Sequence, residues 1–599
     1  MALPDLGSSL LEVFRRSCRR RGEAPLFLAK RDGRWKAWSW RRVDAESAAL
    51  ARFLAARGVA PGDRVLLLAE NRPEWGIADL AVMRAGAVTV PAYTTHTSAD
   101  LAYLLDHSEA VAVICSTRAL ARRLLPALAE APAVHTAVFL EPPDGEPSAR
   151  VRAVTWTEAL AEGERAPAVD ATDTAGPDHL ACFIYTSGTG GRPKGVMLTH
   201  GNILANVGGA VRLLERVGLG EEVFLSFLPL SHAYEHTAGL WLPVAIGARI
   251  HYAESMEALA SNFLEVRPTI VTCVPRLFEV MHQRIRRQVA RRGGLAARLF
   301  ERAVEIGRRR YEGRPLSLGE RLLDPLLERL VREKVRARFG GRLKALVSGG
   351  APLSYEVGVF FVALGLPLLQ GYGQTEAAPV ISCNPPGACR IDTVGPPLEG
   401  VEVRIAGDGE ILVRGPNVMR GYFKDEVATA RALEGGWLHT GDVGELDADG
   451  YLRITDRKKD IIVNSGGDNI APQKVEATLC FEPEIAQAVV YGDRRPYLVA
   501  LIVPDPEFVA AWARRRGMAP EPERVVLEAA FHRAMAEAVE RANRRLSAVE
   551  RVRRFDLLPQ PFTIDNGFMT PTLKIRRQRV FERYREHFER LYEPRTATG

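Results

Sequence analysis

Helix-like and strand-like segments alternate along the first quarter of this 599-residue chain. Apolar residues recur at helical spacing over residues 43–58, and a buried strand is expected directly afterwards, at 64–69. Because each helix returns the chain across a sheet, this order predicts strands that pair mostly in parallel. We therefore expect an α/β fold with mixed, largely parallel sheets. Two more helix and strand pairs are expected, at 75–84 with 87–91 and at 101–107 with 110–115.

The chain is too long for one compact domain, and its character changes toward the C-terminus. After residue 436, short segments rich in glycine and aspartate replace the longer helix and strand pairs, and helices return from residue 520. We expect a large multi-lobed N-terminal domain over residues 1–455 and a small α+β C-terminal domain over residues 456–599. The hydrophobic content of 47% is enough to fill a core in each.

Three features of the sequence bear on the location of the protein: its cysteines, its N-terminal segment and its hydropathy. Seven cysteines are scattered without a CxxC pair or a zinc-like spacing, so reduced thiols are expected. The first residues lack the features of a secretory signal. The longest apolar run, at 357–369, is shorter than the roughly 20 residues that span a bilayer. We expect a cytoplasmic protein without a transmembrane helix.

Positive charge is concentrated in one segment. Residues 281–344 hold 19 Lys and Arg against 7 Asp and Glu, whereas the whole chain has a net charge of +7. Glycines at 293–294 and a turn at 313–315 divide this segment into two or three helices, expected as an insertion between two α/β blocks. It is either a solubilising face or, over 284–342, a peripheral contact with the anionic inner face of a membrane. Nucleic acid is not an expected partner, because aromatic residues are nearly absent among the arginines.

The segment YTSGTGGRPKG, residues 185–195, has the composition of a phosphate-binding loop. It follows an apolar strand at 180–184, and its glycines and hydroxyls present hydrogen-bond donors to which Lys194 adds a point charge. It is not a P-loop, because Lys194 is followed by Gly195 instead of Ser or Thr. A solvated turn is the alternative interpretation.

Two further segments have the features of a nucleotide site. In GYGQTE, residues 371–376, a ring between two glycines can lie flat on a base, and a hydroxyl beside a carboxylate suits a phosphate and its magnesium. In WLHTGD, residues 437–442, the carboxylate of Asp442 can accept from two ribose hydroxyls at once. Each segment alone is also compatible with an ordinary turn.

Taken in order, these segments resemble the motifs of the adenylate-forming superfamily, which includes acyl-CoA synthetases, luciferases and peptide-synthetase adenylation domains. FLPLSHAYEH and RPTIVTCVPRLFE, at 227–236 and 267–279, are similar to its long-chain fatty acyl-CoA synthetase branch. The resemblance extends over nearly the whole chain. The other matching segments are SGGAPL at 348–353, YLRITDRKKD at 451–460, SGGDNIAP at 465–472 and MTPTLKIRR at 569–577.

The resemblance implies roles for the matching residues. Lys574 is the implied catalytic lysine, and Thr186 and Glu376 are implied as catalytic residues and as Mg²⁺ ligands. Gly190 replaces a hydroxyl residue that is usual in the phosphate loop, and we expect weaker contact with ATP in consequence. The implied ATP-binding residues are Ser187, Gly188, Thr189, Gly190, Gly191, Lys194, Gly350, Ala351, Tyr372, Gly373, Thr375, Asp442 and Arg457.

Other matching residues concern the second half-reaction. Asp456 is the implied hinge of a mobile C-terminal domain, and His232 is implied near the acyl channel. Gly466 and Gly467 are implied to line the CoA channel, although Asp468 stands where Glu is more common in the superfamily.

The function implied by the resemblance is that of an ATP-dependent ligase. It would convert a long-chain fatty acid into acyl-AMP and then into acyl-CoA, using ATP, Mg²⁺ and CoA and releasing pyrophosphate and AMP. One alternative is an acyl-AMP ligase that delivers to a carrier protein, and another is a non-catalytic nucleotide-binding sensor. A homodimer is also compatible with the sequence.

Overall fold

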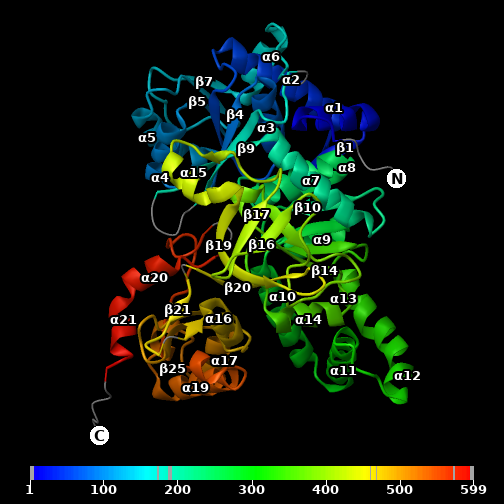
Figure 1. Ribbon diagram of the computed structural model, residues 1–599, viewed down its shortest axis with the longest axis vertical. Helices are drawn as coiled ribbons and strands as arrows, with labels where there is room; N and C mark the ends of the chain where they lie inside the picture. Colours follow the sequence, from blue (N-terminus) through cyan, green and yellow to red (C-terminus); the bar gives the residue numbers. More distant parts are fainter. Residues whose placement is uncertain are drawn as a thin grey trace.

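Figure 1 shows the protein as a computed structural model that describes residues 6–171, 174–186, 192–458, 460–466, 468–570 and 574–593. Two eight-stranded sheets and a four-stranded sheet make up the large N-terminal domain, and a smaller domain follows them. The expected α/β fold with largely parallel sheets and a small C-terminal domain is therefore confirmed. No helix within the described ranges is long and apolar enough to cross a membrane.

The first eight-stranded sheet contains the strands expected from the start of the sequence. Leu66 and Leu68 of β3 face one apolar cluster with the helices α4 and α5, whereas Val65 and Leu67 face another with α2 and α3. A strand that is buried on both faces has a continuous run of apolar residues, and this run made β3 predictable from the sequence. The helices are α2 (Trp40–Ala56), α3 (Pro73–Arg84), α4 (Ser98–Ser108), α5 (Arg118–Glu130) and α6 (Trp156–Arg165).

The strand order of this first sheet is β18-β9-β8-β4-β3-β5-β6-β7. Its strands pair in parallel except for β9, which is antiparallel to both β8 and β18. The strands are β3 (Arg64–Leu68), β4 (Val88–Ala92), β5 (Ala110–Cys115), β6 (Thr136–Phe139), β7 (Arg152–Thr155), β8 (Leu180–Thr186), β9 (Lys194–Thr199) and β18 (Gly421–Tyr422).

The second eight-stranded sheet has the order β15-β14-β13-β12-β10-β11-β1-β2 and is antiparallel only at its two edge pairs. Its strands are β1 (Pro25–Arg31), β2 (Arg34–Ser39), β10 (Val223–Ser226), β11 (Arg249–Tyr252), β12 (Ile270–Cys273), β13 (Ala345–Ser348), β14 (Leu368–Gly373) and β15 (Val380–Cys383). Its helices are α1 (Leu10–Arg21), α7 (His200–Glu215), the π-helix η2 (Glu235–Trp241), α8 (Leu242–Ile246), α9 (Leu259–Val266), α14 (Tyr355–Ala363) and the 3₁₀-helix η4 (Thr375–Ala377).

The basic segment lies between β12 and β13, which are parallel neighbours in the second sheet. It is therefore a long crossover within one sheet, and the expectation of an insertion between two α/β blocks was wrong. Gly293 ends the first helix with a φ of 57°, a conformation that favours glycine. The helices are α10 (Pro275–Arg292), α11 (Gly294–Tyr311), α12 (Leu318–Leu327), the π-helix η3 (Glu328–Arg332) and α13 (Glu333–Arg338).

The four-stranded sheet is antiparallel and ends the N-terminal domain. Its strands are β16 (Glu402–Ile405), β17 (Glu410–Arg414), β19 (Leu438–Leu446) and β20 (Leu452–Arg457), with α15 (Glu426–Ala432) and the 3₁₀-helix η5 (Glu434–Gly436) before β19.

The C-terminal domain has its own core, because two apolar clusters consist only of residues from 462 onward. Its main sheet pairs β23 with β24 antiparallel and β24 with β25 in parallel. The strands are β21 (Ile462–Val463), β22 (Asn469–Ile470), β23 (Ile485–Tyr491), β24 (Leu498–Pro504) and β25 (Val552–Leu557). The helices are α16 (Pro472–Cys480), α17 (Pro506–Arg515), α18 (Pro522–Val525), α19 (Ala529–Asn543), the 3₁₀-helix η6 (Ala548–Glu550), α20 (Arg577–Arg583) and α21 (Arg585–Arg590).

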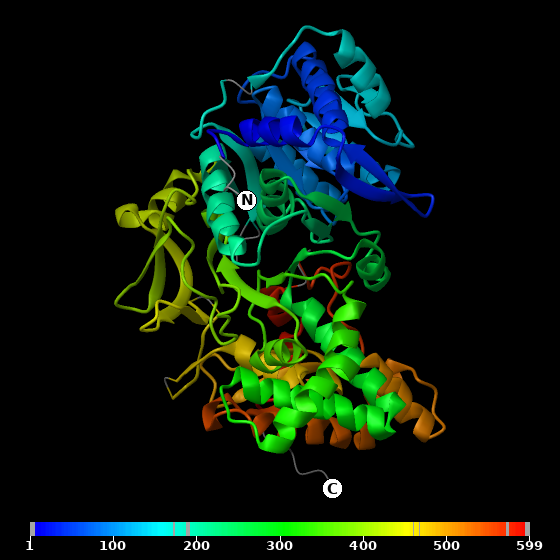
Figure 2. The ribbon, with the colours of Figure 1, turned by 90° about the vertical axis from the view of Figure 1, so that its right-hand side faces the viewer.

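The basic helices lie against the C-terminal domain, as Figure 2 shows for the green helices and the orange domain. Arg287 of α10 forms an ion pair with Asp505, and its other guanidinium nitrogen lies 3.2 Å from Glu507 Oε1. Arg291 Nη2 lies 3.1 Å from Glu507 Oε2. Arg276 Nη1 donates to the carbonyl oxygen of Ala486 at 3.3 Å. Arginines of α10 thus bind residues of the C-terminal domain and join the two domains.

Candidate active site

The hairpin of β8 and β9 carries the first group of predicted site residues. Thr186, at the end of β8, pairs across the antiparallel ladder with Lys194, at the start of β9, so both lie at one end of the hairpin. Lys194 Nζ lies 3.1 Å from Asp425 Oδ2 and 4.9 Å from the ring centre of Tyr422. The predicted loop residues Ser187, Gly188, Thr189, Gly190 and Gly191 lie outside the described residues.

Tyr422 connects this hairpin with the predicted metal ligand Glu376. Its phenolic hydroxyl donates to Glu376 Oε1 at 2.9 Å. The backbone of Glu376 is held as well, since its carbonyl oxygen accepts from the amide of Met419 at 2.8 Å. Sequence reasoning missed Tyr422 and Asp425. An aromatic residue next to a glycine, as at Tyr372, was the available signal for Tyr422.

Tyr372, Asp442 and Arg457 form the second group, and the structure brings them into direct contact. The Tyr372 hydroxyl donates to Asp442 Oδ2 at 2.7 Å, and Arg457 Nε lies 3.2 Å from Asp442 Oδ1. Asp442 and Arg457 face each other across the β19–β20 ladder, which sets their separation. Burial raises the pKa of the Asp442 carboxyl, while Arg457 and the Tyr372 hydroxyl oppose this shift. The three side chains form a polar corner in which Asp442 is already oriented.

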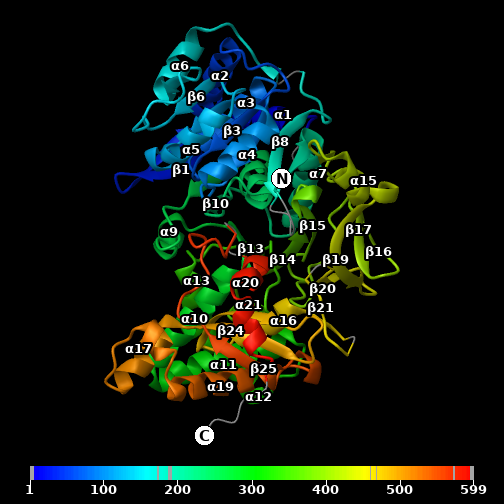
Figure 3. The same cartoon turned by 90° about the vertical axis from the view of Figure 1, so that its left-hand side faces the viewer.

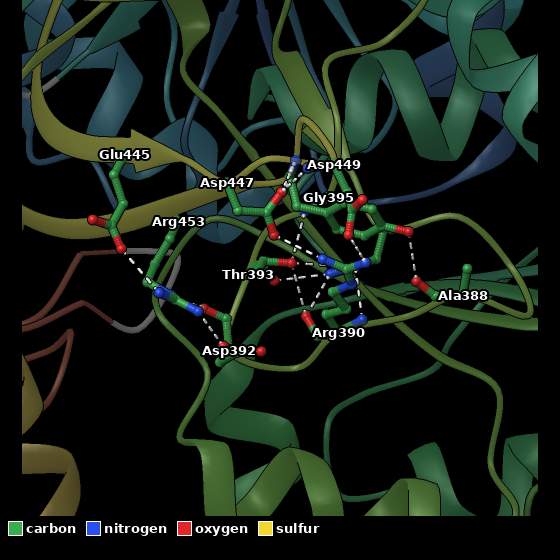
Figure 4. A network of polar contacts seen from close by, with 11 residues as sticks. Ala388, Arg390, Asp392, Thr393, Gly395, Glu445, Asp447, Asp449 and Arg453 are labelled. Atoms are coloured by element: carbon green, nitrogen blue, oxygen red, sulfur yellow. Dashed lines mark hydrogen bonds and ion pairs between the residues drawn. The ribbon is translucent and has the colours of Figure 1, made fainter. Parts of the chain in front are cut away.

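A network of ion pairs fixes the β19–β20 hairpin to the loop that follows β15 (Figure 4). Arg390 Nη1 lies 2.7 Å from Asp447 Oδ2, and Arg453 Nη1 lies 2.9 Å from Glu445 Oε1. A second ion pair joins Arg453 to Asp392. The network thereby holds Asp442, on β19, at a constant place relative to Tyr372, on β14.

Two glycines near this corner are required by geometry. A Cβ on Gly373 would lie 1.9 Å from the carbonyl oxygen of Pro379, so no other residue fits there. Gly350 has a φ of 83°, a backbone conformation that residues with side chains rarely adopt. Gly350 and its neighbour Ala351 lie in the loop after β13. Thr375 opens η4 and is largely buried.

Lys574 belongs to the C-terminal domain and lies three residues before α20, which is the red helix labelled in Figure 3. Its side chain keeps contact with water, but the surrounding protein and the Arg457 guanidinium lower its pKa to about 8, while Asp442 and Asp460 act in the opposite direction. Residues 574 and 442, more than a hundred positions apart, therefore share one electrostatic environment.

His232 lies near the same lysine. Burial lowers the pKa of His232 to about 4, and the charge of Lys574 adds to this shift. Its Nδ1 accepts from the backbone amide of Tyr234 at 3.1 Å, which leaves Nε2 as the nitrogen that carries the proton. The neutral imidazole and the ammonium group thus face the same region of the protein.

Asp456 and Gly466, predicted for the second half-reaction, have different surroundings. Asp456 lies inside β20, and burial raises its pKa to about 6, with Arg577 opposing the shift. Gly466 is exposed, and its amide donates to Asn464 Oδ1 at 2.9 Å. Among the described residues, no contact joins Gly466 to Lys574, and Gly467 lies outside the described residues.

Comparison with known proteins agrees with this geometry. The sequence profile described as "AMP-binding enzyme" matches residues 14–423, and the profile "AMP-binding enzyme C-terminal domain" matches residues 459–596. The long-chain-fatty-acid–CoA ligase FadD15 of Mycobacterium tuberculosis is 35% identical over 575 residues, covering 94% of this chain and 93% of that protein. The peroxisomal long chain acyl-CoA synthetase 6 of Arabidopsis thaliana is 33% identical, covering 94% of this chain and 82% of that protein.

A solved structure has the same fold. The A domain of the carboxylic acid reductase from Segniliparus rugosus, in complex with AMP and a co-purified carboxylic acid, superimposes with a TM-score of 0.78 at 24% identity. The alignment covers 99% of this chain and 96% of that chain. The sequence profiles and the full-length relatives together establish that the chain belongs to the AMP-binding enzyme family.

Proposed function

We propose that this protein is an ATP-dependent ligase that activates a long-chain fatty acid as its acyl-adenylate and then transfers the acyl group to CoA. The observation that carries the proposal is the polar corner of Tyr372, Asp442 and Arg457, to which Lys574 of the small domain comes near enough for their charges to act on its pKa. The full-length similarity to long-chain-fatty-acid–CoA ligases supports the choice of substrates.

In the first half-reaction, a carboxylate oxygen attacks the α-phosphorus of ATP, and pyrophosphate leaves. The barrier is largely electrostatic, because two anions must approach each other. With a pKa of about 8, Lys574 is mainly protonated at neutral pH, so its ammonium group can offset this repulsion. Asp442 would accept from the ribose hydroxyls, Thr375 would donate to the α-phosphate, and the ring of Tyr372 would lie on adenine.

The donor set at Glu376 fits Mg²⁺. No group of three or more His, Cys, Asp or Glu side chains suited to a metal occurs in the part of the chain that the structure describes. Mg²⁺ is commonly held by one or two carboxylates plus the phosphates of a nucleotide, which Glu376 and the Thr186 hydroxyl could provide. When bound, the ion supplies charge neutralisation on the phosphates. Tyr422 keeps the carboxylate of Glu376 oriented through one of its oxygens.

In the second half-reaction, the CoA thiol attacks the acyl carbonyl, and AMP leaves. We propose that residues 456–599 turn about Asp456 relative to residues 1–455, withdraw Lys574 and bring the loop of Gly466 and Gly467 to the CoA channel. Supporting this, Asp456 is the penultimate residue of the last strand of the large domain. His232 would lie where the acyl and CoA channels meet.

The proposal is tested by AMP release with carboxylates of graded chain length, with and without CoA. We expect AMP and acyl-CoA to form in equal amounts with long chains and CoA, and acyl-AMP to remain bound when CoA is omitted. Acyl-AMP that forms but does not react with CoA would indicate a carrier-protein acceptor. The absence of any carboxylate-dependent pyrophosphate release would contradict the ligase assignment.

We further propose a cytoplasmic protein that touches the anionic inner face of a membrane peripherally through residues within 284–342, and that is able to form a homodimer. The positive charge of this segment supports the membrane contact. Three arginines of α10 are poor candidates for it, because Arg287 and Arg291 bind carboxylates of the C-terminal domain and Arg286 Nη1 lies 2.5 Å from Glu301 Oε2.

A further inference from the structure

The helical run from α12 to α13 buries Leu327 and Val331 in the core, but it carries a second apolar row that faces solvent. Glu320 and Asp324 point inward and are 4% and 7% exposed, whereas Leu318 and Leu322 point outward and are 79% and 82% exposed. Leu326 and Leu330 continue the outward row at the same four-residue spacing and are also exposed. A surface helix normally packs its apolar side against the core. A row of exposed leucines over about 18 Å of helix indicates a partner outside the chain.

The inward side is satisfied by ion pairs within the basic segment. Its three acids are Glu320, Asp324 and Glu328, and all of them bind arginines. The ion pairs are Glu320 with Arg302 at 2.8 Å and Arg309 at 2.9 Å, Asp324 with Arg310 at 2.7 Å and Arg332 at 2.8 Å, and Glu328 with Arg332 at 3.4 Å and Arg336 at 2.5 Å. These pairs explain how acids can share the inward side with Leu327 and Val331.

The outward side also carries cations that the protein does not neutralise. Arg321, Arg329, Lys334 and Arg338 are exposed, and none of them has an ion pair with any residue that the structure describes. Arg321 precedes Leu322 directly, and Arg329 precedes Leu330. Glu333 is the acid exposed along this stretch. Apolar and positive side chains therefore alternate on one outer face.

We propose that this outer face of α12, η3 and α13 binds an anionic lipid bilayer. Figure 1 places α12 at the lower right edge of the molecule, where a flat surface can approach it. The leucines would enter the boundary between headgroups and acyl chains, and the cations would lie on lipid phosphates. A second copy of the chain is a poorer occupant, because pairing like faces would bring the unpaired cations together. The inference rests on the membrane contact proposed above and narrows it to one face.

The test is sedimentation of the full-length protein with vesicles, without ATP or fatty acid. We expect binding to equal parts of phosphatidylcholine and phosphatidylglycerol, and little binding to phosphatidylcholine alone. Changing Arg321, Arg329, Lys334 and Arg338 to Gln is expected to weaken binding by about fivefold per cation. Changing Leu318 and Leu322 to Gln is expected to weaken it by about tenfold per leucine. Both variants leave the fold intact, because the changed side chains are exposed and Gln is a good helix former.

A matched control removes four exposed cations of the C-terminal domain, by changing Arg514, Arg515, Arg551 and Arg553 to Gln. Binding that falls equally in this control would overturn the proposal, since only net charge would then matter. Unchanged binding in the leucine variant would also overturn it. Light scattering provides a third outcome that would overturn it. In that outcome the wild type is a dimer, the leucine variant is a monomer, and both bind vesicles equally. Because no substrate is present, none of these outcomes depends on the ligase activity.

Discussion

The two halves of the active site are held in different ways. The half in the large domain is built into strands: Asp442 faces Arg457 across a ladder, and the ion pairs around Arg390 and Arg453 fix that hairpin. The half in the small domain, Lys574, depends on contacts between domains such as those of Arg287. The Arg287–Asp505 pair is largely buried, and the ring of Phe481 from the small domain stacks on His282 of α10. The half in the large domain is thus bonded within a sheet, whereas the half in the small domain is held by side-chain contacts across a domain boundary, which the proposed rotation would break.

The largest expected effect is on the half delivered by the small domain. Lys574→Ala removes the positive charge that faces the reacting anions, so fatty-acid-dependent exchange between ATP and pyrophosphate should fall by roughly a thousandfold. Thioester formation from supplied acyl-AMP should be largely retained, because the proposed domain rotation withdraws Lys574 in that step. Lys474→Ala, an exposed lysine of the same domain, is the control. Equal loss of both half-reactions would remove the distinction between the two halves.

The fixed half should respond differently. Asp442→Ala removes the acceptor that Tyr372 and Arg457 orient, and leaves their polar groups without a partner. Hydrogen bonds to charged groups contribute about 1.5–3 kcal/mol, so the KM for ATP should rise by about tenfold or more. Initial rates at varied ATP measure this, with Asp178→Ala, at an exposed aspartate of the same domain, as the control. An unchanged KM for ATP would show that Asp442 does not contact the nucleotide.

The pH dependence sharpens the comparison, because the half from the small domain contains Lys574, whose pKa is lowered to about 8. The protonated form of Lys574 is the active one, so kcat/KM for adenylation should fall as the pH rises through about 8. By pH 9 the loss should be about tenfold. Lys574→Arg keeps its charge and should lack this decline. A decline that persists in Lys574→Arg would have to be assigned to another group.

The smallest expected effect concerns the contact between domains. Arg287→Ala removes the ion pairs with Asp505 and Glu507, which favours departure of the small domain. Adenylation should fall by about fivefold or less, as expected for a partly exposed pair, while thioester formation is unchanged. Arg286→Ala is a matched control on the same helix, because Arg286 pairs with Glu301 inside the large domain. Equal effects of the two variants would mean that the interface does not control the position of Lys574.

Much of the site was open to prediction from the sequence, because its parts lie in short segments of unusual composition. The ring between glycines at Tyr372 and the carboxylate at Asp442 were recognised from their residue types, and the structure joins them by a hydrogen bond. Tyr422 was missed, although it follows Gly421 as Tyr372 follows Gly371, because one aromatic residue beside a glycine in a two-residue strand is too common a pattern to mark a site. Its role depends on the approach of β18 to β9 from more than two hundred residues away.

The sequence by itself determined the alternation of helices and strands, the order of the motifs and the concentration of positive charge in one segment. These are local properties of spacing and composition, which each stretch of chain expresses on its own. Only the tertiary structure decided which arginines of that segment are already neutralised and which face outward with the leucines of α12. Pairing of charges depends on distances between helices, and those distances exist only once the helices have packed.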